Sequence, residues 1–100
     1  MSESIGEIYA GAIAEIVLYG SYARGEETEE SDIDMALILK KEQTEKQYDR
    51  MTEMVVDYEL DLGITLSIIP IKEQEFTEWK TTLPFYKNVD KEGIVLWKSA

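Results

Sequence analysis

The sequence predicts an α/β (α+β) fold, a small mixed sheet flanked by helices. Three observations lead to this prediction. Short β-branched runs alternate with segments of helical periodicity. Glycines follow several of these segments, where a strand or helix must end. Hydrophobic residues make up 44% of the 100 residues, which suffices for one buried core. We therefore expect residues 1–100 to form a single domain.

The first part of the chain is predicted to contain two strands, and the segment that connects them contains Gly20 and Gly25. Gly20 and Gly25 suit tight turns, because glycine adopts left-handed backbone angles without steric cost. The expected elements are a helix over residues 4–12, a strand over 16–19, a helical turn over 21–24, an acidic loop over 26–31 and a strand over 33–39.

The long segment from residue 42 to residue 62 has the periodicity of an amphipathic helix. Apolar side chains recur every three or four residues and would form one stripe along the helix. Gly63 is a suitable helix stop. The stripe consists of Tyr48, Met51, Val55, Tyr58 and Leu62.

The last part of the chain supplies a third strand and two short helices. The third strand covers residues 64–71, is rich in β-branched residues, and is closed by Pro70. Helices follow over residues 73–80 and 83–92, and Pro84 suits a first helical turn. Residues 94–97 add an edge strand to a sheet that is mainly three-stranded.

The composition excludes several kinds of chemistry. The chain has no cysteine and no histidine, so disulfides, thiolate metal sites and imidazole bases are ruled out. A net charge of −11 argues against direct binding to nucleic acids, which requires lysine and arginine against phosphate. An acidic protein can still handle nucleotides when a divalent cation lies between its carboxylates and the phosphates. No apolar run spans a bilayer and no basic leader opens the chain, so we expect a cytoplasmic protein.

One motif carries the chemistry, and it consists of Gly20 and Ser21, ten further residues, and then Asp32 and Asp34. A glycine after a strand allows a tight turn, and the N–H groups that open the next helix can cradle phosphate. The hydroxyl of Ser21 can donate to a phosphate oxygen. We expect Gly20 and Ser21 to face the two aspartates.

Asp32 and Asp34 are two residues apart on a strand, so their carboxylates leave from the same face. They lie about 6.6 to 6.8 Å apart along the strand. Both can therefore converge on Mg²⁺ or Mn²⁺, with water and a nucleoside triphosphate as the remaining ligands. A Gly-Ser pair or an Asp-x-Asp pair alone is commonplace; the combination in this order is not.

The segment LYGSYARGEETEESDIDMALIL, residues 18–39, resembles the core motif of the minimal nucleotidyltransferases of the DNA polymerase β superfamily. The resemblance implies that Gly20, Ser21 and Arg24 bind the nucleotide, although Arg24 could instead be an ion-pair partner. It implies that Asp32 and Asp34 are catalytic and bind the metal, Mg²⁺ or Mn²⁺, and that ATP or another nucleoside triphosphate is the substrate. Short members of this group act as antitoxins beside HEPN-type partners, and several adenylylate the partner.

The chain departs from the family pattern at the third carboxylate, which active members carry on the next strand. Here Thr65 or Ser67 occupies the expected position, and Ser67 fits the slot better. A hydroxyl neither binds Mg²⁺ as an anion nor accepts a proton near neutral pH.

Two functions are therefore open. The chain is a Mg²⁺-dependent nucleotidyltransferase that modifies a hydroxyl on a partner, plausibly a toxin protein. Alternatively, it is a degenerate nucleotidyltransferase fold that neutralises the partner by contact. The absence of a second domain suggests that a HEPN-type partner or a homo-oligomer recognises any acceptor. We expect neither a membrane nor a nucleic acid as a partner.

Overall fold

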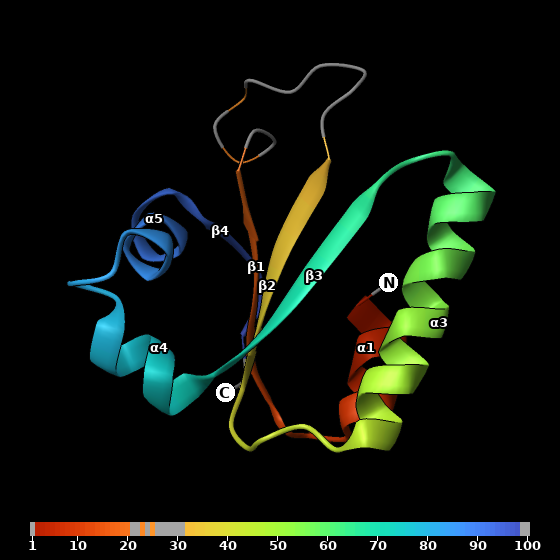
Figure 1. The fold of residues 1–100 in the computed structure, drawn as a ribbon, viewed down its shortest axis with the longest axis horizontal. Helices are drawn as coiled ribbons and strands as arrows, with labels where there is room; N and C mark the ends of the chain where they lie inside the picture. Colours follow the sequence, from red (N-terminus) through yellow and green to blue (C-terminus); the bar gives the residue numbers. More distant parts are fainter. Residues whose placement is uncertain (1, 21–22, 24, 26–31, 99–100) are drawn as a thin grey trace.

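The computed structural model describes residues 2–20, 23, 25 and 32–98 of the chain (Figure 1). The helices and strands, in chain order, are α1 (Ser2–Tyr9), β1 (Ile13–Tyr19), β2 (Ile33–Leu39), α3 (Glu45–Leu62), β3 (Leu66–Lys72), α4 (Glu73–Trp79), α5 (Pro84–Glu92) and β4 (Ile94–Lys98).

The strands form one mixed sheet in the order β3-β2-β1-β4. β1 runs antiparallel to both β2 and β4, whereas β2 and β3 are parallel. The parallel pair requires a crossover connection, which α3 supplies. The mixed sheet flanked by helices confirms the predicted fold class, with four strands rather than mainly three.

Helices cover both faces of the sheet, so the molecule has two cores. In Figure 1, α1 and α3 lie on one side of the sheet and α4 and α5 on the other. The buried residues of the α1/α3 core are Ile5, Ile8, Tyr9, Ile13, Ile16, Met35, Leu37, Leu39, Met51 and Leu66. Those of the α4/α5 core are Ala14, Val17, Ala36, Ile38, Ile71, Phe76 and Val89. Along β2 the residues alternate between the two lists, as the two-residue period of a strand requires. In β1 the register shifts between Ile13 and Glu15, so Ile13 and Ile16 share one core.

Helix α3 begins three residues later than the sequence suggests, because Thr44 caps it. Its hydroxyl accepts from the backbone N–H of Gln47 at 3.1 Å, and the Gln47 side chain accepts from the backbone N–H of Thr44 at 2.8 Å. This reciprocal capping box satisfies two amide groups that the helix itself cannot. The helix ends where predicted, at Gly63, whose φ of 66° is left-handed.

Of the predicted apolar stripe of α3, Met51 is buried and Val55 and Tyr58 are half-buried. Met51 is 3% exposed, while Tyr48 and Leu62 at its two ends are 48% and 60% exposed. No helix in the described part of the chain is both long enough and apolar enough to cross a bilayer.

Two further boundaries differ from the sequence-based expectation. α1 ends at Tyr9 rather than near residue 12, because Ala10 and Gly11 have positive φ angles of 45° and 86°. Pro70 lies inside β3 instead of closing it. β3 is an edge strand, and an edge position tolerates a residue without an N–H group.

Helix α5 passes directly into β4 through Gly93. A Cβ at this position would collide with the Cγ1 atom of Val17 and with the carbonyl oxygen of Val89. Glycine therefore permits the close approach of this junction to β1.

Candidate functional site

Asp34 lies near the start of β2, between two neighbouring strands. Its register partner on β1 is Tyr19, and its register partner on β3 is Ser67. Residues that are directly paired across strands present their side chains on the same face. The three side chains therefore form a row across one end of the sheet, on the face that α4 and α5 cover.

Gly20 follows β1 and approaches the Asp34 carboxylate closely. Its φ is +77°, and a Cβ built on it would lie 2.7 Å from Asp34 Oδ2. Two independent constraints thus require glycine here: the left-handed backbone and the space taken by the carboxylate. The turn after β1 and the start of β2 therefore meet at this point.

Asp32 immediately precedes β2 and is exposed. The pKa of Asp34 is raised above its usual value, first by burial and then by the negative charge of Asp32. The two carboxylates are therefore close enough to repel each other. A divalent cation would relieve both the repulsion and the cost of burial, and carboxylate oxygens are the ligands that Mg²⁺ prefers. The donor set fits Mg²⁺ or Mn²⁺ on these grounds.

The described residues contain no group of three or more acidic side chains placed to hold a metal ion. The carboxylate next to the Gly20 turn is that of Asp34, and the charge of Asp32 acts on it. Ser21 and Arg24, which the family resemblance assigns to the nucleotide, lie outside the described residues.

The two candidates for the third-carboxylate position occupy different places. Ser67 is in β3, directly opposite Asp34. Thr65 precedes β3, is exposed, and its carbonyl oxygen accepts a hydrogen bond from the Ile33 N–H at 2.9 Å. An aspartate at position 67 would face Asp34, whereas one at position 65 would lie about 6.6 Å further along.

Sequence reasoning missed Tyr19 as a neighbour of this site. The pKa of its hydroxyl is raised by burial and by the charge of Asp34. Its ring makes an edge-to-face contact with Phe85 of α5 at a centroid distance of 5.5 Å. Phe85 in turn contacts Tyr86 at 5.6 Å. No signal in the sequence gives the register that brings Tyr19 beside Asp34.

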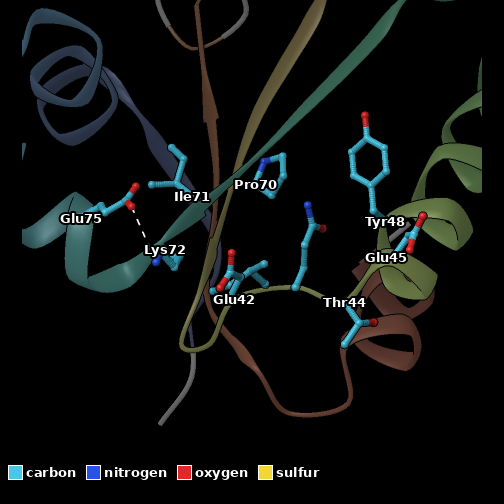
Figure 2. Close-up of a pocket in the computed structure, with 10 residues that line it drawn as sticks. Glu42, Thr44, Glu45, Tyr48, Pro70, Ile71, Lys72 and Glu75 are labelled. Carbon is cyan, nitrogen blue, oxygen red and sulfur yellow. Dashed lines mark ion pairs between the residues drawn. The ribbon is translucent and has the colours of Figure 1, made fainter.

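A separate pocket of about 380 Å³ lies at the other end of the sheet, where β2 and β3 end (Figure 2). Figure 2 shows Tyr48 on one side of it and the Lys72–Glu75 ion pair, 3.8 Å long, on the other. Glu42 and Glu45 also line it. Its acidic lining disfavours a triphosphate by charge repulsion. This pocket is therefore not the nucleotide site that the motif predicts.

The chain is similar in sequence to nucleotidyltransferases. The family model described as polymerase beta, nucleotidyltransferase, matches residues 3–100. A protein of Methanocaldococcus jannaschii, MJ0604, is 36% identical over 89 residues, which are 89% of this chain and 83% of the relative. A second, MJ0141 from the same organism, is 32% identical over 71% of this chain and 72% of the relative. Both relatives are named protein adenylyltransferases, and the names give this activity as a proposed one.

Solved structures with the same fold include a toxin–antitoxin pair with AMP-PNP. Its matching chain has a TM-score of 0.66 and 18% identity, with 98% of this chain and 71% of that chain covered. A nucleotidyltransferase structure from Sulfolobus solfataricus has a TM-score of 0.53 and 23% identity, covering 96% and 75%. A complex of a tri-AMPylated Shewanella oneidensis HEPN toxin with its MNT antitoxin has a TM-score of 0.52 and 15% identity, covering 98% and 72%. At these identities the likeness concerns the fold.

Proposed function

Because the chain belongs to the polymerase β nucleotidyltransferase family, among its minimal nucleotidyltransferases, we propose that it transfers a nucleoside monophosphate from ATP or another triphosphate to a hydroxyl group. The supporting observation is the approach of Gly20 to the Asp34 carboxylate, with the charge of Asp32 close by. A phosphate-type turn and a metal-type carboxylate pair thereby share one end of the sheet.

Asp32 and Asp34 would hold Mg²⁺ or Mn²⁺, which when bound neutralises phosphate charge and stabilises the leaving pyrophosphate. The protein's own part is electrostatic and steric. Asp34 must be ionised to act as a ligand, and its raised pKa makes that ionisation dependent on pH. Gly20 keeps the backbone close to the carboxylate without a side chain between the nucleotide and the metal ligands. We assign Ser21 and Arg24 to the triphosphate on the resemblance alone.

In the transfer, an acceptor hydroxyl oxygen would form a bond to the α-phosphorus of ATP. The bond between that phosphorus and the pyrophosphate oxygen would break, and the hydroxyl proton would pass to solvent or a nearby base. We propose a HEPN-type protein as the acceptor. The relatives are named for protein adenylylation, and one structure of the same fold is a complex of a tri-AMPylated HEPN toxin with its MNT antitoxin. The cytoplasmic location favoured by the sequence belongs to this proposal.

A second candidate function rests on Ser67. Its hydroxyl lies opposite Asp34, where the family pattern places a carboxylate, and it supplies neither a charge nor a base at neutral pH. A protein with two carboxylates could retain nucleotide binding while transfer is slow. In that case it would act as an antitoxin by contact with its partner.

The deciding experiment incubates the protein with ATP labelled at the α-phosphate, Mg²⁺ and a HEPN-type protein, the proposed acceptor. The proposal expects label on the partner with the wild type and none with the double variant Asp32→Asn, Asp34→Asn. The matched control is Asp49→Asn, which removes an exposed carboxylate from α3 and should transfer normally. Absence of label, together with neutralisation of the partner by wild type and double variant alike, would support the contact function instead.

Calorimetry with ATP and Mg²⁺ gives a second readout that needs no acceptor. The double variant should lose the metal-dependent part of the ATP affinity, because the described residues hold no group of three or more acidic side chains that could bind the metal instead. An unchanged affinity would contradict the assignment of the metal to Asp32 and Asp34.

A further inference from the structure

Strand β4 is an open edge of the sheet. It pairs with β1 on one side, and none of the described residues pairs with its other side. An open edge presents unpaired N–H and C=O groups and is a template for pairing with another strand. All five of its residues are exposed, and the four apolar ones are 42% to 51% exposed: Ile94, Val95, Leu96 and Trp97.

The other edge of the sheet is protected against such pairing. β3 contains Pro70, which has no N–H group to donate to an added strand. Most of the residues of β3 are half-buried. Lys72, the charged residue of β3, stands at its end and is exposed. β4 has neither a proline nor an interior charge, because its charged residue, Lys98, is the last one and lies 3.7 Å from Glu15 of β1.

The charge distribution indicates what could pair with β4. The chain as a whole has a net charge of −11, yet the side chains of residues 80–100 have a net charge of +2. A basic partner would be attracted to the acidic remainder of the molecule and not to this segment. A two-fold contact brings the same surface of each copy together, and the remainder of the chain, with −13 (−11 minus +2), would repel itself more strongly than this segment does. The charged residues of the segment are Lys80, Lys87, Asp90, Lys91, Glu92 and Lys98.

We propose that β4 pairs antiparallel with β4 of a second copy of this chain across a two-fold axis. The register that pairs all five residues places Leu96 opposite Leu96 of the second copy and Val95 opposite Trp97. An aromatic side chain opposite a β-branched one is a favourable cross-strand pair. Lys98 falls opposite Ile94, so no like charges are directly opposed. The same surface serves both copies, as a two-fold interface requires, and the two sheets become one of eight strands.

The first test measures the mass of the full chain in solution over a range of concentrations, up to about 1 mM, where even weak dimers are populated. We expect a dimer for the wild type. Leu96→Lys places two like charges opposite each other at the two-fold axis and should raise the dimer dissociation constant about tenfold or more. The matched control is Leu60→Lys on α3, a leucine that is 78% exposed and should leave the dimer unchanged.

The second test uses the absence of cysteine from the chain. A single Leu96→Cys substitution should give a disulfide-linked dimer under mild oxidation, because residues facing each other on antiparallel strands meet the distance requirement of a disulfide. Leu60→Cys is the control and should crosslink far more slowly. Circular dichroism establishes that each variant is folded.

A monomeric wild type at the highest concentration would overturn the proposal. So would a dimer that Leu96→Lys leaves intact, or equal crosslinking of the two cysteine variants. The inference does not rest on nucleotidyl transfer. ATP binding by Leu96→Lys, measured separately, reports on the nucleotide site and distinguishes a failure of one proposal from a failure of the other.

Discussion

The Asp34 carboxylate occupies the space that a side chain on Gly20 would need, since a Cβ there would lie 2.7 Å from Asp34 Oδ2. Gly20 and Asp34 are fourteen positions apart in sequence. Their approach makes the conformation of the turn after β1 and the position of the carboxylate mutually dependent.

Gly20→Ala should therefore damage both the fold and the site. The left-handed backbone at φ +77° costs an L-residue about 1 to 2 kcal/mol, and the new methyl group must also displace the Asp34 carboxylate. Gly11→Ala is a matched control, because Gly11 has a φ of +86° but nothing lies within 4 Å of an added Cβ. Both variants should lose unfolding free energy in urea, whereas only Gly20→Ala should weaken Mg²⁺-dependent ATP binding. Equal binding by the two variants would show that Gly20 serves the backbone alone.

Asp34→Asn should make the metal-free protein more stable at neutral pH. The folded-state pKa of Asp34 is raised, so the folded protein binds a proton more readily than the unfolded chain. Its contribution to stability is fully present below the unfolded pKa and is lost as pH rises through the folded pKa. The ionised carboxylate thus costs stability at neutral pH, and the neutral amide removes that cost.

Urea unfolding of the metal-free proteins from pH 3 to pH 8 checks this prediction. The advantage of Asp34→Asn over wild type should grow as pH rises and vanish at the acid end. Asp49→Asn removes one exposed charge from the same chain and should not reproduce that profile. A wild type that is more stable than Asp34→Asn at pH 8 without metal would contradict the raised pKa.

Ser67→Asp should increase nucleotidyl transfer to the partner. Ser67 is the register partner of Asp34, so an aspartate there would add a third carboxylate beside the proposed metal ligands. A general base typically contributes about 10²- to 10⁴-fold to rate, which sets the expected gain. Thr77→Asp is the control, because Thr77 is exposed on α4 and is not paired with any residue of β2. Rapid wild-type transfer that Ser67→Asp fails to improve would mean that the site is complete by another route.

Gly93→Ala should destabilise the junction between α5 and β4. Its backbone angles, φ −70° and ψ 146°, are accessible to alanine, so the cost comes from the collision with Val17 and Val89. Overpacking of this kind costs about 1 to 3 kcal/mol. Gly6→Ala is the opposite case: Gly6 lies in α1 with nothing within 4 Å of an added Cβ, and alanine should stabilise the helix by about 0.5 to 1 kcal/mol. Thermal unfolding of the two variants should therefore shift in opposite directions.

Several elements could be predicted from the sequence because their signals are local. β2 spans the predicted residues 33–39, and α3 stops at the glycine that was expected to stop it. The periodicity predicts a start of α3 at residue 42, whereas the capping box of Thr44 and Gln47 sets it at Glu45. The sequence predicts that Pro70 ends β3, yet the strand continues past it to Lys72. A proline is tolerated there because β3 is an edge strand, which the sheet order alone reveals.

By itself, the sequence determined the order of helices and strands and the pairing of a glycine turn with Asp32 and Asp34, since both depend on residues close together in the chain. The tertiary structure alone decided which side chains flank Asp34. Tyr19 and Ser67 are placed beside it by the register of β1 and β3 against β2. That register follows from how the two cores pack on opposite faces of the sheet, because slipping a strand by one residue would turn its buried side chains outward.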